Sequence, residues 1–124
     1  MSLEQDIITL FPAVQEKPQI SDEFIENNQN IMEISGDIQY FKVVPAYMLW
    51  SIKNKDIELV DMHTINALAE YGRTKIRDND YFNFKWRCSK TQKRIVIAFL
   101  EWCRNEILTS DAEQIERALK HWKK

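Results

Sequence analysis

The scarcity of turn-forming residues is the feature that most constrains this chain. Its 124 residues include only two glycines, Gly36 and Gly72, and three prolines, whereas glycine alone makes up about 7% of an average protein. Sheets joined by tight hairpins need glycine in their turns, so this composition argues against them. It also excludes the glycine-rich phosphate loops of P-loop and dinucleotide-binding proteins. The sequence therefore predicts helices rather than a sheet.

Length and composition indicate one globular domain over residues 1–124. Hydrophobic residues make up 44% of the chain and charged residues 29%, a balance that supplies one core and a charged surface. Apolar residues recur at helical spacing along most of the chain. We therefore expect an all-α fold, a compact single-domain bundle of about five helices.

Short polar motifs predict where several of these helices begin. Ser21 and Asp61 are suitable N-caps, because their side-chain oxygens can accept hydrogen bonds from free helix amides. The segments 89–92 (Ser-Lys-Thr-Gln) and 110–113 (Ser-Asp-Ala-Glu) have the spacing of a capping box. The strongest helix prediction is the one that follows Ser89.

Two segments are expected to lack regular helix over much of their length. Residues 1–20 read as a short amphipathic helix that ends at Pro12, followed by an extended connection. Residues 73–88 read as a long basic and aromatic loop. Between these segments, Pro45 suits the first position of a nearly apolar helix that runs to Ile52.

Charge is distributed unequally along the chain. The formal net charge is −2, but residues 1–62 carry a net charge of −7 and residues 63–124 a net charge of +5. The densest basic stretch, 73–94, interleaves cations with aromatic residues, which is typical of surfaces that bind phosphates and unstacked bases. The alternative is that the acidic half folds against the basic half and the charges offset. The candidate residues for a nucleic acid or another polyanion are Lys85, Trp86, Arg87, Lys90, Lys93 and Arg94.

The number of large aromatic residues suggests a different function. Tyr47, Trp50 and Trp122 are candidates for a protein interface, because aromatic residues are enriched at interaction hot spots. The alternative is that these rings fill the core. A non-catalytic protein-interaction module, binding another protein or a second copy of itself, is the first functional hypothesis, and polyanion binding is the second.

Catalytic and metal-binding patterns are not recognisable in the sequence. The two histidines, His63 and His121, do not have the spacing of metal ligands. Cys88 and Cys103 are outside any C-x-x-C motif and are expected to be reduced thiols. We therefore expect no enzyme activity, no metal and no cofactor. Without a long apolar segment or a basic N-terminal leader, we expect a cytoplasmic protein that does not enter the membrane.

Several short motifs resemble a family of small uncharacterised bacterial proteins, a domain of unknown function. They are the I-x-x-x-F-P step at 7–12, the P-A-Y-M-L stretch at 45–49 and the S-x-x-Q helix start at 89–92 that runs on to Phe99-Leu100. The chain departs from the family pattern at 41–44, where the family tends to be more aromatic. The resemblance implies a helical bacterial protein and transfers no functional residues.

Overall fold

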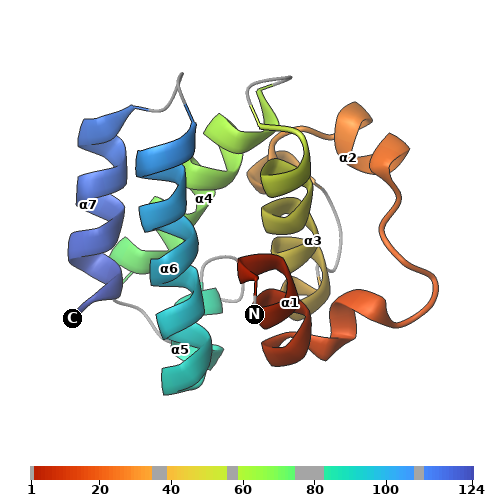
Figure 1. The fold of residues 1–124 in the computed structure, drawn as a ribbon, viewed down its shortest axis with the longest axis horizontal. Coiled ribbons are helices and arrows are strands. Elements are labelled where there is room, and N and C mark those ends of the chain that lie inside the picture. The colour runs from red at the N-terminus through yellow and green to blue at the C-terminus, as the bar shows by residue number, and fades with distance from the viewer. Residues whose placement is uncertain (1, 35–38, 56–58, 75–82, 108–110) are drawn as a thin grey trace.

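The computed structural model describes residues 2–34, 39–55, 59–74, 83–107 and 111–124, and these residues form an all-α fold (Figure 1). The prediction of the fold class is confirmed, and the described residues form seven α-helices rather than about five. The described residues also contain two short 3-10 helices, η1 and η2. The elements are α1 (Leu3–Leu10), η1 (Pro12–Gln15), α2 (Asp22–Asn27), η2 (Ile31–Glu33), α3 (Tyr40–Lys53), α4 (Val60–Arg73), α5 (Phe84–Arg87), α6 (Lys90–Glu106) and α7 (Ala112–Trp122).

The helices form two groups that meet at α4. In Figure 1, α6 and α7 lie side by side with α4 behind them, and α1 and α3 form the other half of the molecule. Helix α4 packs against both α7 and α3, and α1 packs against both α3 and α6. One hydrophobic cluster connects all seven helices, with Phe11, Tyr47, Phe84, Phe99 and Trp122 among its largest buried side chains. In the described part of the chain, none of the helices has the length and apolarity that crossing a bilayer requires.

Helix α3 corrects the prediction for Pro45. The helix begins at Tyr40, so Pro45 lies inside it rather than at its first position. A proline inside a helix removes one backbone hydrogen bond. Val43 and Val44 in the preceding turn are buried, and the burial of these apolar side chains favours the longer helix over a start at the proline.

Helix starts follow the predicted caps in two places and differ in two others. The Ser21 hydroxyl caps α2, and Ser89 with Gln92 forms the complete capping box of α6. Helix α4 begins at Val60 after Leu59, so Asp61 lies in its first turn and is not the N-cap. Helix α7 is capped by Asp111, whose carboxylate accepts hydrogen bonds from two backbone amides, whereas Ser110 lies outside the described residues.

The expected extended and loop segments also contain short helical structure. Residues 12–15, predicted as part of an extended connection, form η1. Residues 84–87, predicted as loop, form α5, and residues 75–82 of that predicted loop lie outside the described part of the chain. Helix α5 brings Phe84 and Lys85 into the interior, where both side chains are buried.

Gly72 allows α4 and α7 to approach closely. A Cβ atom at this position would lie 2.7 Å from both Cδ1 and Nε1 of Trp122 and 3.2 Å from Cβ of His121. The indole ring cannot easily move away, because it is buried and its Nε1 donates to the carbonyl oxygen of Leu68 at 2.7 Å. The missing side chain of Gly72 therefore makes room for the last helix to dock.

Candidate anion-binding surface

The N-terminal turns of α6 carry three of the predicted cations on one side. Lys90, Lys93 and Arg94 are three and four residues apart, so they are neighbours on the helix surface. Lys90 and Arg94 are exposed and Lys93 is half-buried. The first turn contains no acidic residue, although a carboxylate is the residue that the positive pole of a helix favours. The cations and the helix dipole therefore act together to make this end of α6 positive.

Lys85 joins α5 to the end of α7. Its side chain is only 5% exposed, and its Nζ donates to the carbonyl oxygen of His121 at 2.7 Å. This contact places a cation at the negative pole of α7, where the helix dipole favours it. Burial lowers the pKa of Lys85, and the charges of Lys93 and Lys124 lower it further. Two lysines from other parts of the chain thus lie within electrostatic range of Lys85.

Several cations also lie near His121. Its pKa is lowered by burial first and then by four cations, Lys124, Lys85, Lys120 and Arg73. These groups come from the end of α4, from α5 and from the end of α7, which converge near the C-terminus in Figure 1. We call this group of residues the cationic corner: Arg73, Lys85, Lys93, Lys120, His121 and Lys124.

Four of the described acidic residues of the C-terminal half form ion pairs outside the cationic corner. Arg104 contacts Glu116 at 2.7 Å and Glu101 at 4.0 Å, Lys55 contacts Glu106 at 3.9 Å, and Arg117 contacts Glu113 at 3.4 Å. Within the cationic corner, only Arg73 has a carboxylate within ion-pair distance among the described residues, at 2.6 Å from Glu70. Among the described residues, the other cations of the cationic corner have no carboxylate within ion-pair distance. Lys75, Arg77, Asp78 and Asp80 lie outside the described residues.

Trp86 does not have the free ring that base stacking requires. Its side chain is half-buried, and its Nε1 donates to the carbonyl oxygen of Thr74 at 2.9 Å. The ammonium of Lys85 lies over the ring, 5.4 Å from its centroid. Trp86 thus anchors α5 to the end of α4. Arg87 is exposed, and its guanidinium lies 5.3 Å from the centre of the Phe41 ring.

The aromatic residues predicted to form a protein interface lie in the core. Tyr47 is 0% exposed, Trp50 4% and Trp122 1%. The Tyr47 hydroxyl donates to the carbonyl oxygen of Asn28, and the Trp122 indole is bonded to α4. The assignment of these three residues to a surface is therefore wrong. Their rings fill the space between the helices, and the Tyr47 hydroxyl and the Trp122 indole N–H are hydrogen-bonded inside the fold.

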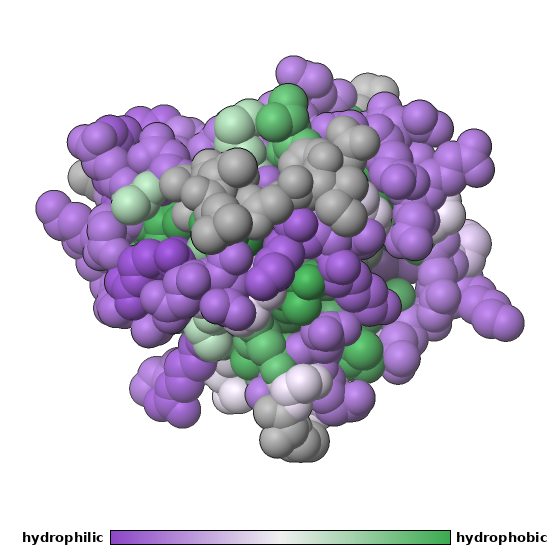
Figure 2. Space-filling view, turned by 45° about the horizontal axis from the view of Figure 1, so that its top comes forward, coloured by the Kyte–Doolittle hydropathy of each residue, from purple (hydrophilic) through white to green (hydrophobic). Residues whose placement is uncertain are grey.

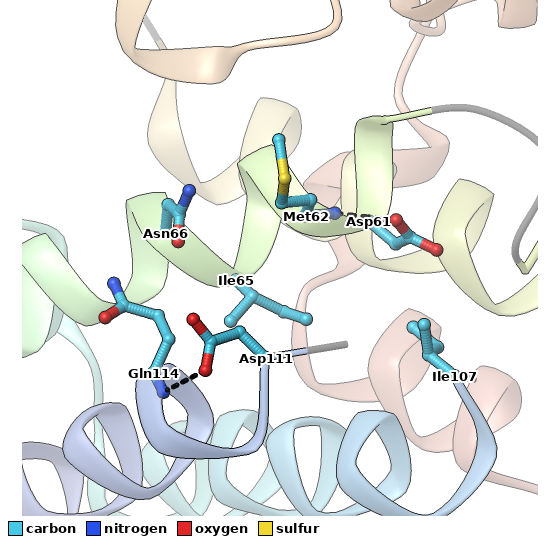
Figure 3. A pocket seen from close by; sticks show the side chains of 7 residues that line it. All are labelled: Asp61, Met62, Ile65, Asn66, Ile107, Asp111 and Gln114. Carbon is cyan, nitrogen blue, oxygen red and sulfur yellow. Dashed lines mark hydrogen bonds between the residues drawn. The ribbon is translucent and has the colours of Figure 1, made fainter. Parts of the chain in front are cut away.

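A small cavity lies between the start of α4 and the start of α7 (Figure 3). Its volume of about 10 Å³ corresponds to one water molecule. The two carboxylates beside it are occupied by backbone contacts, since Asp61 accepts from the amide of Met62 at 2.7 Å and Asp111 caps α7. The described residues contain no group of three or more metal-ligating side chains. This cavity therefore offers little chemistry.

A larger groove of about 230 Å³ lies between α3 and the segment from η1 to α2. Ile8, Ile20, Ile25 and Leu49 contribute its apolar lining, and Gln15, Gln19, Asp22 and Lys53 its polar lining. The lining carries one acidic and one basic residue, so it does not select a ligand by charge.

The two cysteines are expected to be unreactive in the folded protein. Both are buried free thiols. Burial raises the pKa of Cys88 to about 12, against the opposing charges of Lys93 and Arg87. Burial and then the Asp61 carboxylate raise the pKa of Cys103 well above its usual value. A thiol reagent at pH 8 should modify neither cysteine in the native state and both in denaturant, since only the thiolate reacts.

The raised pKa values of the two thiols determine how the free energy of unfolding changes with pH. A group whose pKa is raised by folding contributes stability below its unfolded pKa, which is 9.0 for these thiols. The free energy of unfolding should therefore decrease as the pH rises above 9.0. Urea denaturation at pH 8 and pH 10 measures this change. Rapid labelling of the native protein would contradict the burial of both thiols.

Comparisons with protein-family models, with curated proteins and with solved structures found no match to this chain. The resemblance to small uncharacterised bacterial proteins thus stays a prediction.

Proposed function

We propose that this protein binds nucleic acid through the phosphate backbone, using the exposed cations at the start of α6 together with the cationic corner. The observation that carries the proposal is the group of cations from α4, α5, α6 and α7, of which only Arg73 has a carboxylate within ion-pair distance among the described residues. Like charges held close together lower stability, so such an arrangement is expected where an anion is bound. Among the described residues, Glu101, Glu106 and Glu116 form ion pairs with other partners.

The structure favours contacts with phosphates over contacts with bases. Trp86, which the sequence suggested as a stacking platform, is bonded to the backbone of Thr74. The remaining exposed groups, Arg87, Lys90 and Arg94, are cations. Phosphate contacts supply affinity and register but do not read sequence. Binding should therefore depend strongly on salt and weakly on nucleotide sequence.

Fluorescence anisotropy with labelled single-stranded and duplex oligonucleotides tests this function. With about four phosphate contacts, we expect affinity for a single strand to fall about 50-fold between about 50 and 200 mM salt. The double charge reversal Lys90→Glu/Arg94→Glu should remove measurable binding, because both side chains are exposed on the same side of α6.

The matched control is Lys17→Glu/Lys53→Glu, which changes the net charge by the same amount. Lys17 and Lys53 are also exposed, and the last turn of α3 lies at the upper edge of the view in Figure 1, away from the C-terminus at the lower left. This control should bind nearly as well as the unchanged protein. Equal losses in both variants would mean that net charge alone attracts the oligonucleotide. Absence of binding at low salt would exclude the proposed function.

A non-catalytic protein-interaction module is the second candidate, and it now depends on other residues. Leu59 is 56% exposed and Met62 40%, and both lie at the start of α4. On the face shown in Figure 2, hydrophobic side chains reach the surface in areas broken up by hydrophilic ones. Isolated exposed apolar residues are common in proteins without partners. A protein partner or self-association is therefore less well supported by the structure than an anionic partner.

A further inference from the structure

The groove between α3 and the segment from η1 to α2 is lined by apolar side chains from several elements. They include Ile8, Val14, Ile20, Ile25, Leu49 and Trp50. The groove volume of about 230 Å³ is below the about 300–1,000 Å³ that is typical of pockets for small molecules. The groove therefore suits a few side chains of a partner better than a whole cofactor.

Trp50 gives this groove a hydrogen-bond donor that the fold leaves unused. Its side chain lines the groove and is only 4% exposed. Among the described residues, no acceptor is bonded to its indole N–H, whereas the indoles of Trp86 and Trp122 donate to backbone carbonyl oxygens. A buried indole N–H normally has a hydrogen-bond partner. A peptide in the groove would supply a carbonyl oxygen as the acceptor.

One wall of the groove belongs to an acidic segment of the chain. Residues 16–27 contain one lysine and four carboxylates, and the carboxylates are those of Glu16, Asp22, Glu23 and Glu26. All four are exposed, and among the described residues none has a cation within ion-pair distance. Asp22 lines the groove, and Glu26 lies one turn further along α2, on the same side of the helix. The carboxylates outnumber the two nearby lysines, Lys17 and Lys53, so this wall favours a cationic partner.

We propose that this groove binds a basic, amphipathic peptide segment of a partner protein. Apolar side chains of the segment enter the groove, a backbone carbonyl oxygen accepts from Trp50, and lysines or arginines lie against the carboxylates of α2. The site is separate from the proposed nucleic-acid surface. In Figure 1, the chain from η1 to α2 forms the right-hand edge of the molecule, whereas α6 and α7 lie on the left. The two surfaces therefore select partners of opposite charge, and either proposal can fail without the other.

The test compares three labelled peptides of equal length by fluorescence anisotropy with the full chain. The first combines lysines with leucines at helical spacing, the second has glutamates in place of the lysines, and the third has serines in place of the leucines. We expect the leucine–lysine peptide to bind about tenfold tighter than either of the others, because it alone matches both the apolar groove and the acidic wall. Equal binding of the glutamate peptide would overturn the selection by charge, and equal binding of the serine peptide would overturn the use of the groove.

The variant Ile20→Lys tests whether the peptide occupies this groove. Ile20 is half-buried and lies outside the helices, so a lysine there adds a cation to the lining and should weaken binding of the leucine–lysine peptide about tenfold. The matched control is Ile97→Lys, since Ile97 is also a half-buried isoleucine but lies on α6. Circular dichroism checks that both variants are folded. The control should bind nearly as well as the unchanged protein, and an equal loss in both variants would overturn the location.

A second variant, Asp22→Asn/Glu26→Gln, removes charge from the wall with almost no change in side-chain size. The loss of two exposed ion pairs should weaken the leucine–lysine peptide about fivefold. The control Glu113→Gln/Glu116→Gln removes the same charge from exposed positions of α7 and should have little effect. Equal losses in the two double variants would show that net charge alone attracts the peptide and would overturn the proposal.

Sedimentation of the chain alone distinguishes a partner protein from a second copy of this chain. A monomer that binds the leucine–lysine peptide supports a segment from a partner. A dimer that dissociates in Ile20→Lys would overturn the proposal, because a second copy would then fill the groove.

Discussion

Replacing Phe84 by alanine is expected to lower the free energy of unfolding by about 4 kcal/mol. The Phe84 side chain is 0% exposed and is the centre of the aromatic core. Its ring centroid lies 5.7 to 6.3 Å from those of Phe11, Tyr40, Phe41, Tyr71 and Trp122. Removing the Phe84 ring would leave a cavity, because the five surrounding rings are held by different elements and cannot all move in to fill it.

Urea denaturation followed by circular dichroism measures this effect. The matched control is Phe24→Ala, since Phe24 is 36% exposed and should cost less than about 1 kcal/mol. Phe84→Leu keeps most of the volume and should be intermediate, which gives a folded reference if the alanine variant is too unstable to measure. A loss below 1 kcal/mol in Phe84→Ala would mean that α5 is not packed as described.

Trp122→Ala is expected to have a comparable effect, with a loss of about 4 kcal/mol in the free energy of unfolding. The Trp122 ring is 1% exposed, packs edge-on to Phe84 and fills the space above Gly72. Its indole also donates to the Leu68 carbonyl oxygen. Because domains are stable by only about 5–15 kcal/mol, either substitution removes a large fraction of the total.

Trp122→Phe separates packing from hydrogen bonding at this position. The smaller ring keeps much of the apolar contact and loses the N–H donor, so we expect a loss of about 1–2 kcal/mol, close to the value of one hydrogen bond with a small cavity. Trp102→Ala is the control for removing a tryptophan, because Trp102 is only partly buried. Equal effects of Trp102→Ala and Trp122→Ala would contradict the central position of Trp122.

The elements that could be predicted from the sequence are those whose signal is local. The Ser89 capping box specifies the start of α6 because both of its hydrogen bonds join residues three apart. The sequence motif predicts that α4 begins after Asp61, but the helix begins at Val60, whose side chain is buried in the core. The start of α3 was missed for a similar reason, as the burial of Val43 and Val44 outweighs the defect at Pro45. Tertiary packing set both of these boundaries.

The candidate surface was predicted only in part, because its cations come from distant positions. The density of charge along 73–94 indicated Lys90, Lys93 and Arg94, which do share one side of a helix. It could not indicate that Lys85 turns inward to the end of α7, a contact between residues 36 positions apart. The aromatic residues were predicted to form a surface but lie in the core. Composition does not show whether Tyr47 or Trp50 faces solvent or the core.

The side-chain amide of Gln92 links the start of α6 to the end of α1. Its oxygen accepts from Ser89 within the capping box, while its nitrogen donates to the carbonyl oxygen of Leu10 at 2.9 Å. One residue thus starts α6 and ties the end of α1 to it across 82 positions of sequence. The entropic free-energy cost of closing a loop rises slowly with its length, by about 0.6 kcal/mol for each doubling. Insertions in the connections between the helices of this stretch should therefore add little to the entropic cost of forming this contact.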